Sequence, residues 1–288
     1  MYIVLFDRED RLGSNLLIYL AQLLYAHNNK LFIKFKNNSK SDYSFSHSIF
    51  VKILFNYIDK YNEQLSSEEI SDDTLFEFEN PRNYMYMLSF TLRDIQNDYL
   101  SYFNKFIYDE IKSDILEIRN VYNQVPFDVN KTILVHLRLD DMAHWKDYDG
   151  SICSNYYKNK IKKREDCYDS NYGGGNSQSP LSKEKLQAVI DRAQSKFTDY
   201  KVLLITSPRS DTSFFEYDVI KNHDESYDLY LLSLCKVVIL SRSTYAIASL
   251  LFNNEKDMVY VPLWGHAVCC GFDTIYDNND ISKYEYFY

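Results

Sequence analysis

Glycine and proline are scarce in this sequence: 7 of its 288 residues are Gly and 5 are Pro. The few glycines form neither the G-x-G-x-x-G turn of dinucleotide-binding proteins nor the G-x-x-x-x-G-K-[ST] phosphate-binding loop. Collagen-like and low-complexity architectures are excluded for the same reason. Any site for phosphate groups must therefore be built from side chains and helix termini instead of a glycine loop.

Three further features are missing. The five cysteines are odd in number and include no C-x-x-C pair, which argues against a disulfide framework and against a zinc ribbon. The net charge of −9 argues against nucleic acid as a partner, because its phosphates attract basic surfaces. No apolar run approaches the 18 residues of a membrane span. The apolar stretch 1–6 is too short for a signal peptide, so a cytoplasmic protein is expected.

The length predicts two domains, and 45% hydrophobic residues indicate an ordinary globular chain. In the first half, apolar patterns predict a strand at 2–6, a helix at 12–27 and a strand at 31–35. Helical periodicity then dominates residues 41–120. A second organisation starts near Pro126, which sets the expected domains at 1–125 and 126–288.

Strands and helices alternate in the second half, which predicts βαβ units around a parallel sheet. The expected strands are 132–137, 201–206, 237–240 and 258–261, and the expected helices are 181–197, 213–220, 228–234 and 244–252. The long polar segment 140–180, with its triple glycine at 173–175, is expected to form loops around one short helix. The fold class is therefore α/β.

Polar groups follow three of the expected strands, and ligands of open parallel sheets bind at the carboxyl ends of strands. The groups are His136 and Arg138 after the first strand, Ser207 and Arg209 after the second, and Ser241, Ser243 and Thr244 after the third. Arginine can bind a diphosphate through two parallel hydrogen bonds, and a helix start adds backbone N–H donors. Each group also has a structural interpretation: Ser243 or Thr244 as an N-cap, Arg138 paired with a following aspartate, and His136 as a core histidine.

Three motifs resemble those of the GDP-fucose-dependent fucosyltransferase superfamily, which includes α-1,2-fucosyltransferases and protein O-fucosyltransferases. Residues 11–15 (RLGSN) are similar to its G-R-[LF]-G-N-Q opening, and residues 136–141 (HLRLDD) to its H-x-R-R-G-D. Residues 228–246 resemble the D-x-x-x-M-S-x-C-x-x-x-I-x-S-N-S-[ST]-F-S block of the α-1,2 group. The motifs occur in family order across most of the chain.

This resemblance implies the GT-B fold, in which two Rossmann-like domains with parallel sheets face a central cleft. It also implies that the second domain binds the nucleotide sugar, that the first binds the oligosaccharide acceptor, and that transfer inverts the anomeric centre without a metal or other cofactor. The chain departs from the motifs at Leu139, Asp140 and Ser14, where the family has Arg, Gly and Asn. These departures leave the donor open.

Length and the Tyr- and Asn-rich composition also resemble glycosyltransferases of large algal DNA viruses, the chloroviruses, which build glycans on capsid proteins. Among them are β-xylosyltransferases. This likeness implies transfer of xylose from UDP-xylose to a fucose of a capsid N-glycan in the host cytoplasm. A GDP-fucose-dependent fucosyltransferase is the alternative, and a catalytically inactive glycan-binding protein is a further one.

An inverting transfer needs a base for the acceptor hydroxyl and stabilisation of the departing diphosphate. Arg138 is expected to bind the diphosphate together with Ser243 and Thr244. The base is expected in the first domain at Asp73, with Asp72 as second choice and Asp7 as rival. A solvated acidic loop is the structural interpretation of the first two.

Gly13, Ser14 and Asn15 are expected to shape the donor site at the first strand–helix turn, because glycine allows close approach of the backbone. Trp145 and Tyr148 are candidate acceptor contacts. The D-x-D sequence at 147–149 leaves open a metal-dependent GT-A glycosyltransferase, in which it would hold a divalent cation on the nucleotide sugar.

Overall fold

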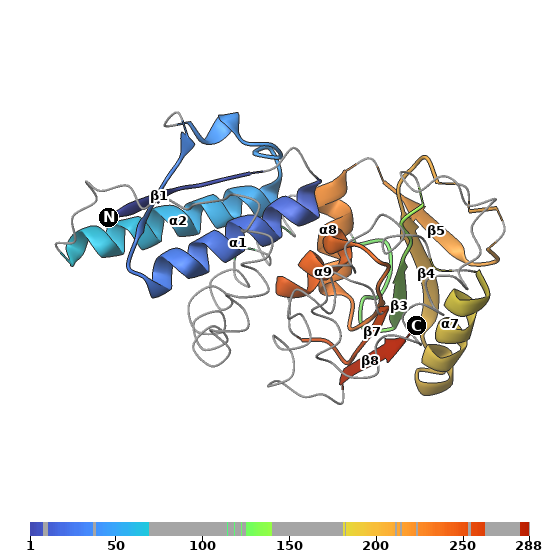
Figure 1. Ribbon diagram of the computed structural model, residues 1–288. Helices are drawn as coiled ribbons and strands as arrows, with labels where there is room; N and C mark the ends of the chain where they lie inside the picture. The colour runs from blue at the N-terminus through green and yellow to red at the C-terminus, as the bar shows by residue number, and fades with distance from the viewer. Residues whose placement is uncertain are drawn as a thin grey trace, which may run out of the picture. The chain divides into compact units, whose positions relative to one another are not determined.

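The computed structural model of the protein (Figure 1) describes residues 1–7, 11–36, 39–68, 114, 118, 122, 125–139, 181, 183–210, 212–213, 215–222, 224–252, 255–262 and 283–287. The chain divides into two compact units, Met1–Leu116 and Glu117–Tyr288. The boundary at 125/126 that the sequence suggests stays a prediction. Both units have the α/β character that the sequence predicts.

The first unit begins as a parallel β–α–β segment. Its described elements are β1 (Tyr2–Val4), α1 (Leu12–Asn28), β2 (Phe32–Lys34), the 3-10 turn η2 (Lys40–Asp42) and α2 (Ile49–Ser67). The two strands pair in parallel, with Ile3 opposite Ile33. Helix α2 packs against both α1 and β2. The first three of these elements, β1, α1 and β2, begin and end within two residues of the positions expected from the sequence.

Aromatic rings fill the space between α1, η2 and α2. Tyr19, Tyr43, Phe35 and Phe55 pack with ring centroids 5.0–6.1 Å apart, mostly edge to face. Edge-to-face pairs add about 0.5–1.5 kcal/mol each to the hydrophobic gain of burial. Part of the large aromatic content of the chain is therefore used in this core.

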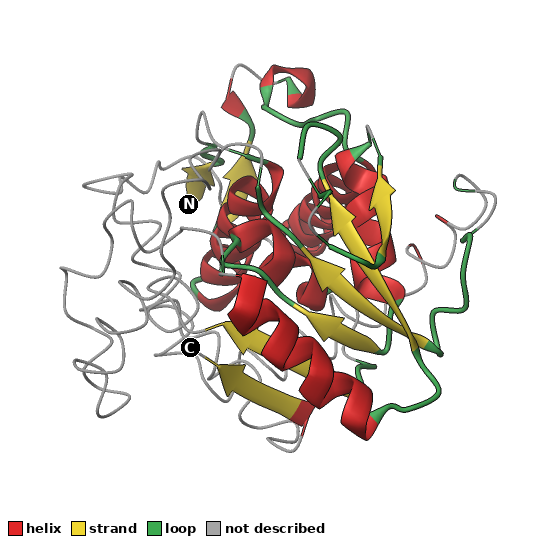
Figure 2. Cartoon of the chain, turned by 90° about the vertical axis from the view of Figure 1, so that its right-hand side faces the viewer, coloured by secondary structure: helices red, strands yellow, loops and turns green. Residues whose placement is uncertain are grey.

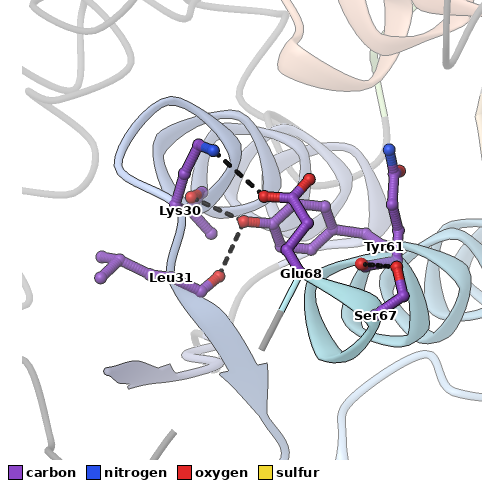
Figure 3. A network of polar contacts seen from close by, with 7 residues as sticks. Lys30, Leu31, Tyr61, Ser67 and Glu68 are labelled. Atoms are coloured by element: carbon purple, nitrogen blue, oxygen red, sulfur yellow. Dashed lines mark hydrogen bonds and ion pairs between the residues drawn. The ribbon is translucent and has the colours of Figure 1, made fainter. Parts of the chain in front are cut away.

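Helix α1 ends in a Schellman motif, next to the side-chain contacts of Lys30 and Tyr61 that Figure 3 shows from close by. The Leu31 N–H donates to Ala26 O (2.8 Å) and the Lys30 N–H to His27 O (3.2 Å). Lys30 has φ 50°, in the left-handed region that favours glycine. The Tyr61 hydroxyl of α2 lies 2.8 Å from Ala26 O and 2.9 Å from Leu31 O, so it fastens this end of α1 to α2.

Replacing Lys30 by glycine is expected to stabilise the protein by about 1 kcal/mol, because glycine adopts this conformation without strain. The exposed ion pair of Lys30 with Glu68 contributes little, since both side chains are accessible to water. Lys30→Ala is the matched control, because it removes the same ion pair but keeps a Cβ. Urea unfolding checks both variants; equal stability of the Gly and Ala variants would contradict the assignment.

The second unit contains a six-stranded, all-parallel sheet in the order β5-β4-β3-β6-β7-β8. The strands are β3 (Thr132–His136), β4 (Lys201–Thr206), β5 (Asp218–Lys221), β6 (Val237–Ile239), β7 (Met258–Pro262) and β8 (Tyr284–Phe287). Numbered from β3, this is the 3-2-1-4-5-6 order of doubly wound nucleotide-binding folds. The order reverses between β3 and β6, and ligands of such folds bind beside that point.

Helices cover both faces of this sheet. Helix α7 (Lys183–Lys196) packs on one face, where Ile133, Val135 and Leu137 share its core cluster. Helices α8 (Glu225–Leu234) and α9 (Thr244–Leu251) lie on the opposite face (Figure 1). Figure 2 shows α7 in front of the strands. Because side chains alternate along a strand, Leu134, His136 and Arg138 are directed toward the α8–α9 face.

The helix expected at 213–220 is wrong. Residues 218–221 form β5, whose Val219 and Ile220 pair with Leu204 and Ile205 of β4. Two β-branched residues suit a strand better than a short helix, and the partner strand decides the conformation. Strand β8 was not expected, because its alternating Tyr-Glu-Tyr-Phe sequence at the sheet edge lacks an apolar run.

Side chains satisfy the backbone groups at both ends of α8. The carboxylate of Asp224 accepts hydrogen bonds from the N–H groups of Ser226 (2.9 Å) and Tyr227 (3.3 Å), so α8 starts three residues before the expected position. At the other end, Lys256 Nζ donates to the carbonyl oxygens of Leu232, Ser233 and Cys235, each at 2.7 Å. Lys256 is 1% exposed. Burial lowers its pKa to about 7, whereas the three carbonyl dipoles favour its charged form.

Lys256→Met is expected to destabilise the second unit by about 3 kcal/mol, because methionine fills the space but leaves three buried carbonyl oxygens without their donor. Lys183→Met on the exposed side of α7 is the control and is expected to change stability by less than about 0.5 kcal/mol. Urea unfolding measures the difference. Equal stabilities of the two variants would show that α8 does not depend on this ammonium group.

Candidate functional site

The candidate site lies at the carboxyl ends of β3 and β6, beside the point where the strand order reverses. Val135 of β3 is level with Ile239 of β6, so the residues that follow each strand leave the sheet next to one another. The structure thereby brings together two of the three predicted strand ends, residues 136–138 and residues 241–244.

His136 and Ser241 form the contact between these two strand ends. His136 Nδ1 and Ser241 Oγ are 2.6 Å apart, and both side chains are buried. The imidazole also packs on the ring of Tyr245 from α9, with centroids 5.6 Å apart. Burial, together with the nearby Arg138, lowers the pKa of His136 to about 3. The ring is therefore neutral and too weak a base to activate Ser241 as a nucleophile, because general bases work best near the pH of the reaction.

Arg138 extends from the end of β3 to the start of α9. Its Nη1 donates a hydrogen bond to the carbonyl oxygen of Arg242, at 3.4 Å. Arg138 is half-buried and Arg242 is buried. Arg138 thus places a positive charge at the switch point, where it suits an anionic ligand.

Ser243 is the N-cap of α9. Its hydroxyl oxygen accepts a hydrogen bond from the Tyr245 N–H at 3.2 Å, and Thr244 is the first helical residue. The side chain of Ser243 is therefore a helix cap, as its structural interpretation predicted. The amino end of α9 still directs its positive dipole toward the ends of β3 and β6, so it complements the charge of Arg138.

The third predicted strand end, after β4, is held by hydroxyl contacts. Thr206 Oγ1 donates to Leu137 O (2.9 Å) and lies 2.8 Å from Ser210 Oγ, which is 3.2 Å from Ser207 Oγ. These contacts tie the β4 turn to the end of β3. Arg209 is exposed on the same turn. Ser207 therefore has a structural role here, whereas Arg209 can reach solvent.

Asp228, in the first turns of α8, belongs to the same neighbourhood but had no role in the sequence interpretation. Asn222 Nδ2 donates to its Oδ1 at 2.6 Å. Burial raises the pKa of Asp228 to about 7, and the nearby Asp224 and Glu225 add to this shift. Burial, and after it the charge of Asp228, raises the pKa of Tyr245, whose ring packs on His136. In the sequence, the signal that could have identified Asp228 is its position as the first residue of the motif at 228–246.

Asp228→Asn is expected to stabilise the protein at pH 8 and to have little effect at pH 4. The folded protein keeps this carboxyl protonated up to about pH 7, whereas the unfolded chain ionises it near pH 4. Ionisation therefore reduces stability progressively from pH 4 to about pH 7, with a full cost of about 2–4 kcal/mol above that range. Asparagine keeps the acceptor oxygen for Asn222 without ionising.

Urea unfolding of both proteins at pH 4, 6 and 8 measures this difference. Asp257→Asn, which changes an exposed carboxylate of the same unit, is the control and is expected to follow the wild type at each pH. A pH-independent difference between Asp228→Asn and wild type would contradict the raised pKa.

The predicted residues of the first motif lie in α1. The helix starts at Leu12, so Gly13, Ser14 and Asn15 occupy its first turn and not the turn before it, where they were expected. Asn15 is fully buried, and its Nδ2 donates to Ser44 Oγ (3.1 Å) and to Arg11 O (3.5 Å). These residues belong to the first unit, whereas the residues of the switch point belong to the second.

Several sequence expectations fall outside the described residues: Asp72, Asp73, Trp145, Tyr148, the D-x-D sequence at 147–149 and the triple glycine at 173–175. Among the residues that the structure does describe, no three His, Cys, Asp or Glu side chains gather as ligands for a metal ion. No helix in that part of the chain is long and apolar enough to cross a membrane.

No protein-family model and no curated protein sequence matches the chain. A functional assignment therefore depends on the geometry of the switch point and on the motifs that lead to it.

Proposed function

We propose that the protein is an inverting, metal-independent glycosyltransferase of the GT-B type, which moves a sugar from a nucleotide sugar to a hydroxyl of a glycan. One observation carries this proposal: His136, Arg138 and the amino end of α9 meet at the switch point of a 3-2-1-4-5-6 parallel sheet. Nucleotides bind at this place in doubly wound sheets. Two of the three sequence motifs, at 136–141 and 228–246, include these same residues.

In this proposal, Arg138 and the amino end of α9 bind the diphosphate of the donor. The guanidinium group presents two parallel N–H donors to phosphate oxygens, which a lysine cannot do. As the bond between sugar and diphosphate breaks, negative charge grows on the leaving group, and a fixed positive group lowers the free energy of that state. The neutral His136, held by Ser241 and Tyr245, keeps the end of β3 in place without adding charge.

The acceptor hydroxyl must lose its proton to a base. Asp73, with Asp72 as second choice, stays the predicted base, and neither belongs to the described residues. The proton would pass from the acceptor hydroxyl to the carboxylate while the hydroxyl oxygen bonds to the anomeric carbon and the diphosphate departs with the electron pair.

For the donor we propose UDP-xylose, with transfer to a fucose of a viral capsid N-glycan; GDP-fucose is the alternative. Leu139 supports a donor other than GDP-fucose, because it stands where the fucosyltransferase motif has its second arginine. It is 4% exposed and packs in the core under α7. That position therefore supplies no charge to the switch point.

Arg138→Ala is expected to reduce transfer at least about 100-fold, because removing one preorganised donor to a developing charge has this effect in enzymes. Arg138→Lys is expected to recover only part of the rate, since lysine lacks the fork. Arg192→Ala is the matched control: Arg192 lies on α7 and pairs with Glu285. The measurement is release of UDP or GDP from a panel of nucleotide sugars, with excess EDTA, in the presence of glycan acceptors.

A thermal shift with UDP, GDP, UDP-xylose and GDP-fucose tests binding separately, because a ligand of the folded state raises its stability. The wild type and Arg192→Ala are expected to respond, and Arg138→Ala to respond weakly. Wild-type turnover in Arg138→Ala would overturn the role of the switch point, and loss of activity in EDTA would favour the metal-dependent alternative. Binding without any transfer would favour a glycan-binding protein.

A further inference from the structure

Tyr245, in the first turn of α9, contacts three separate parts of the second unit. Its hydroxyl group donates a hydrogen bond to the carbonyl oxygen of Glu225, in the first turn of α8. Its ring packs on His136 at the end of β3, with centroids 5.6 Å apart and planes at 33°. Its backbone N–H donates to the hydroxyl oxygen of Ser243, the N-cap of α9. Tyr245 therefore joins α8, β3 and α9 beside the switch point.

The hydroxyl of Tyr245 distinguishes this chain from the motif that it resembles. The block that is similar to residues 228–246 has phenylalanine at this position, so the resemblance assigns no role to the hydroxyl. A phenylalanine ring can pack on His136 in the same way, but it cannot donate to Glu225 O. The link between α9 and α8 through this side chain is therefore a property of the present sequence.

The contact with His136 bears on the position of Arg138. His136 is held at Nδ1 by Ser241, at 2.6 Å, and on one ring face by Tyr245. A hydrogen bond at the ring edge and a contact on the ring face together fix the orientation of the imidazole. Arg138 follows two residues later on the same side of the strand, so a fixed strand end also fixes the origin of its side chain.

We propose that Tyr245 is a positioning residue of the diphosphate site, which consists of Arg138 and the amino end of α9. Its ring holds the end of β3, and its hydroxyl ties the first turn of α9 to α8. The two components of the site are thereby kept at a fixed spacing, and a preorganised site loses less binding free energy to ordering. The role rests on the proposed function, because the diphosphate of a nucleotide sugar is the ligand.

The same hydroxyl connects the diphosphate site to an acidic part of α8. The pKa of Asp228 is raised to about 7, chiefly by burial, and among the described residues no cation lowers it. Asn222, in the turn after β5, donates a hydrogen bond to this carboxyl group. The other titratable groups around it are Asp224, Glu225 and Tyr227 on α8, Tyr245 on α9, and Tyr122 from the segment that precedes β3.

Tyr245 is consequently expected to transmit the ionisation of Asp228 to the diphosphate site. Below about pH 7 the carboxyl group is neutral, and above that pH it carries a negative charge. The charge attracts the hydroxyl hydrogen of Tyr245 away from Glu225 O and repels an anion at the switch point. Both effects act in the same direction, so the affinity for a nucleotide sugar falls as the pH rises from 6 to 8.

Calorimetric titration with UDP-xylose and GDP-fucose tests the positioning role on the full-length protein. Tyr245→Phe keeps the ring and removes the hydroxyl, and its affinity at pH 6 is expected to fall about fivefold, as the loss of one neutral hydrogen bond does. Tyr217→Phe is the matched control, because it removes a tyrosine hydroxyl that contacts Gln187 on the α7 side of the same sheet. It is expected to bind like the wild type.

The imidazole signal of His136 gives a readout that needs no nucleotide. Burial lowers the pKa of His136 to about 3, so a change of its signal between pH 6 and 8 comes from a neighbouring group. NMR of ¹³C-histidine-labelled protein is expected to show a step near pH 7 in the wild type, no step in Asp228→Asn and a smaller one in Tyr245→Phe. Loss of the signal in His136→Gln identifies it.

Wild-type donor affinity in Tyr245→Phe would overturn the proposal, and so would an equal loss of affinity in Tyr217→Phe. A His136 signal without a step in the wild type, or with the same step in Tyr245→Phe, would overturn it as well. If the wild type binds no nucleotide sugar at either pH while the step depends on Asp228 and Tyr245, the positioning contact stands and the transferase proposal fails.

Discussion

The burial of β3 on both faces is the constraint on which the second unit depends. All five residues of this strand are buried, between β4 and β6 in the sheet and between α7 and the α8–α9 pair across it. Polar side chains cannot be accommodated along such a strand unless each finds a partner, because burying an unpaired polar group costs several kcal/mol. The chemistry is therefore confined to the point where the strand ends. At that point His136 contacts Ser241, and Arg138 donates a hydrogen bond to the carbonyl oxygen of Arg242 before α9.

Much of this sheet could be predicted because doubly covered strands are continuous apolar runs. Residues 132–137 and 201–206 show such runs, and both are strands within a residue of the expected bounds. Strands β5 and β8 could not be predicted in the same way. They are the two edges of the sheet, and their polar residues conceal the pattern; β5 is exposed at both of its ends. Their conformation is decided by pairing with β4 and β7, which no local signal contains.

The residues of the candidate site also fall into a group that the local sequence could predict and a group that it could not. Residues that follow a strand could be proposed from sequence, since the end of a parallel strand is a known position for ligands. The pairing of His136 with Ser241 joins residues 105 positions apart, and the neighbourhood of Asp228 depends on α8 packing against α9. These contacts are products of tertiary structure. The hydrogen bond from Ser44 to Asp7, the rival candidate for the base, is of the same kind, across 37 positions.

Helix α8 is fastened at both ends, by Asp224 at its start and by Lys256 at its end. The hydroxyl of Tyr122 also donates to Asp224, at 2.9 Å, which adds a contact from outside the helix. A helix held in this way cannot slide along its axis, so the position of Asp228 beside Tyr245 is set before any ligand arrives. A ligand at this edge of the sheet consequently loses little free energy to ordering the protein, and its affinity reflects the contacts themselves.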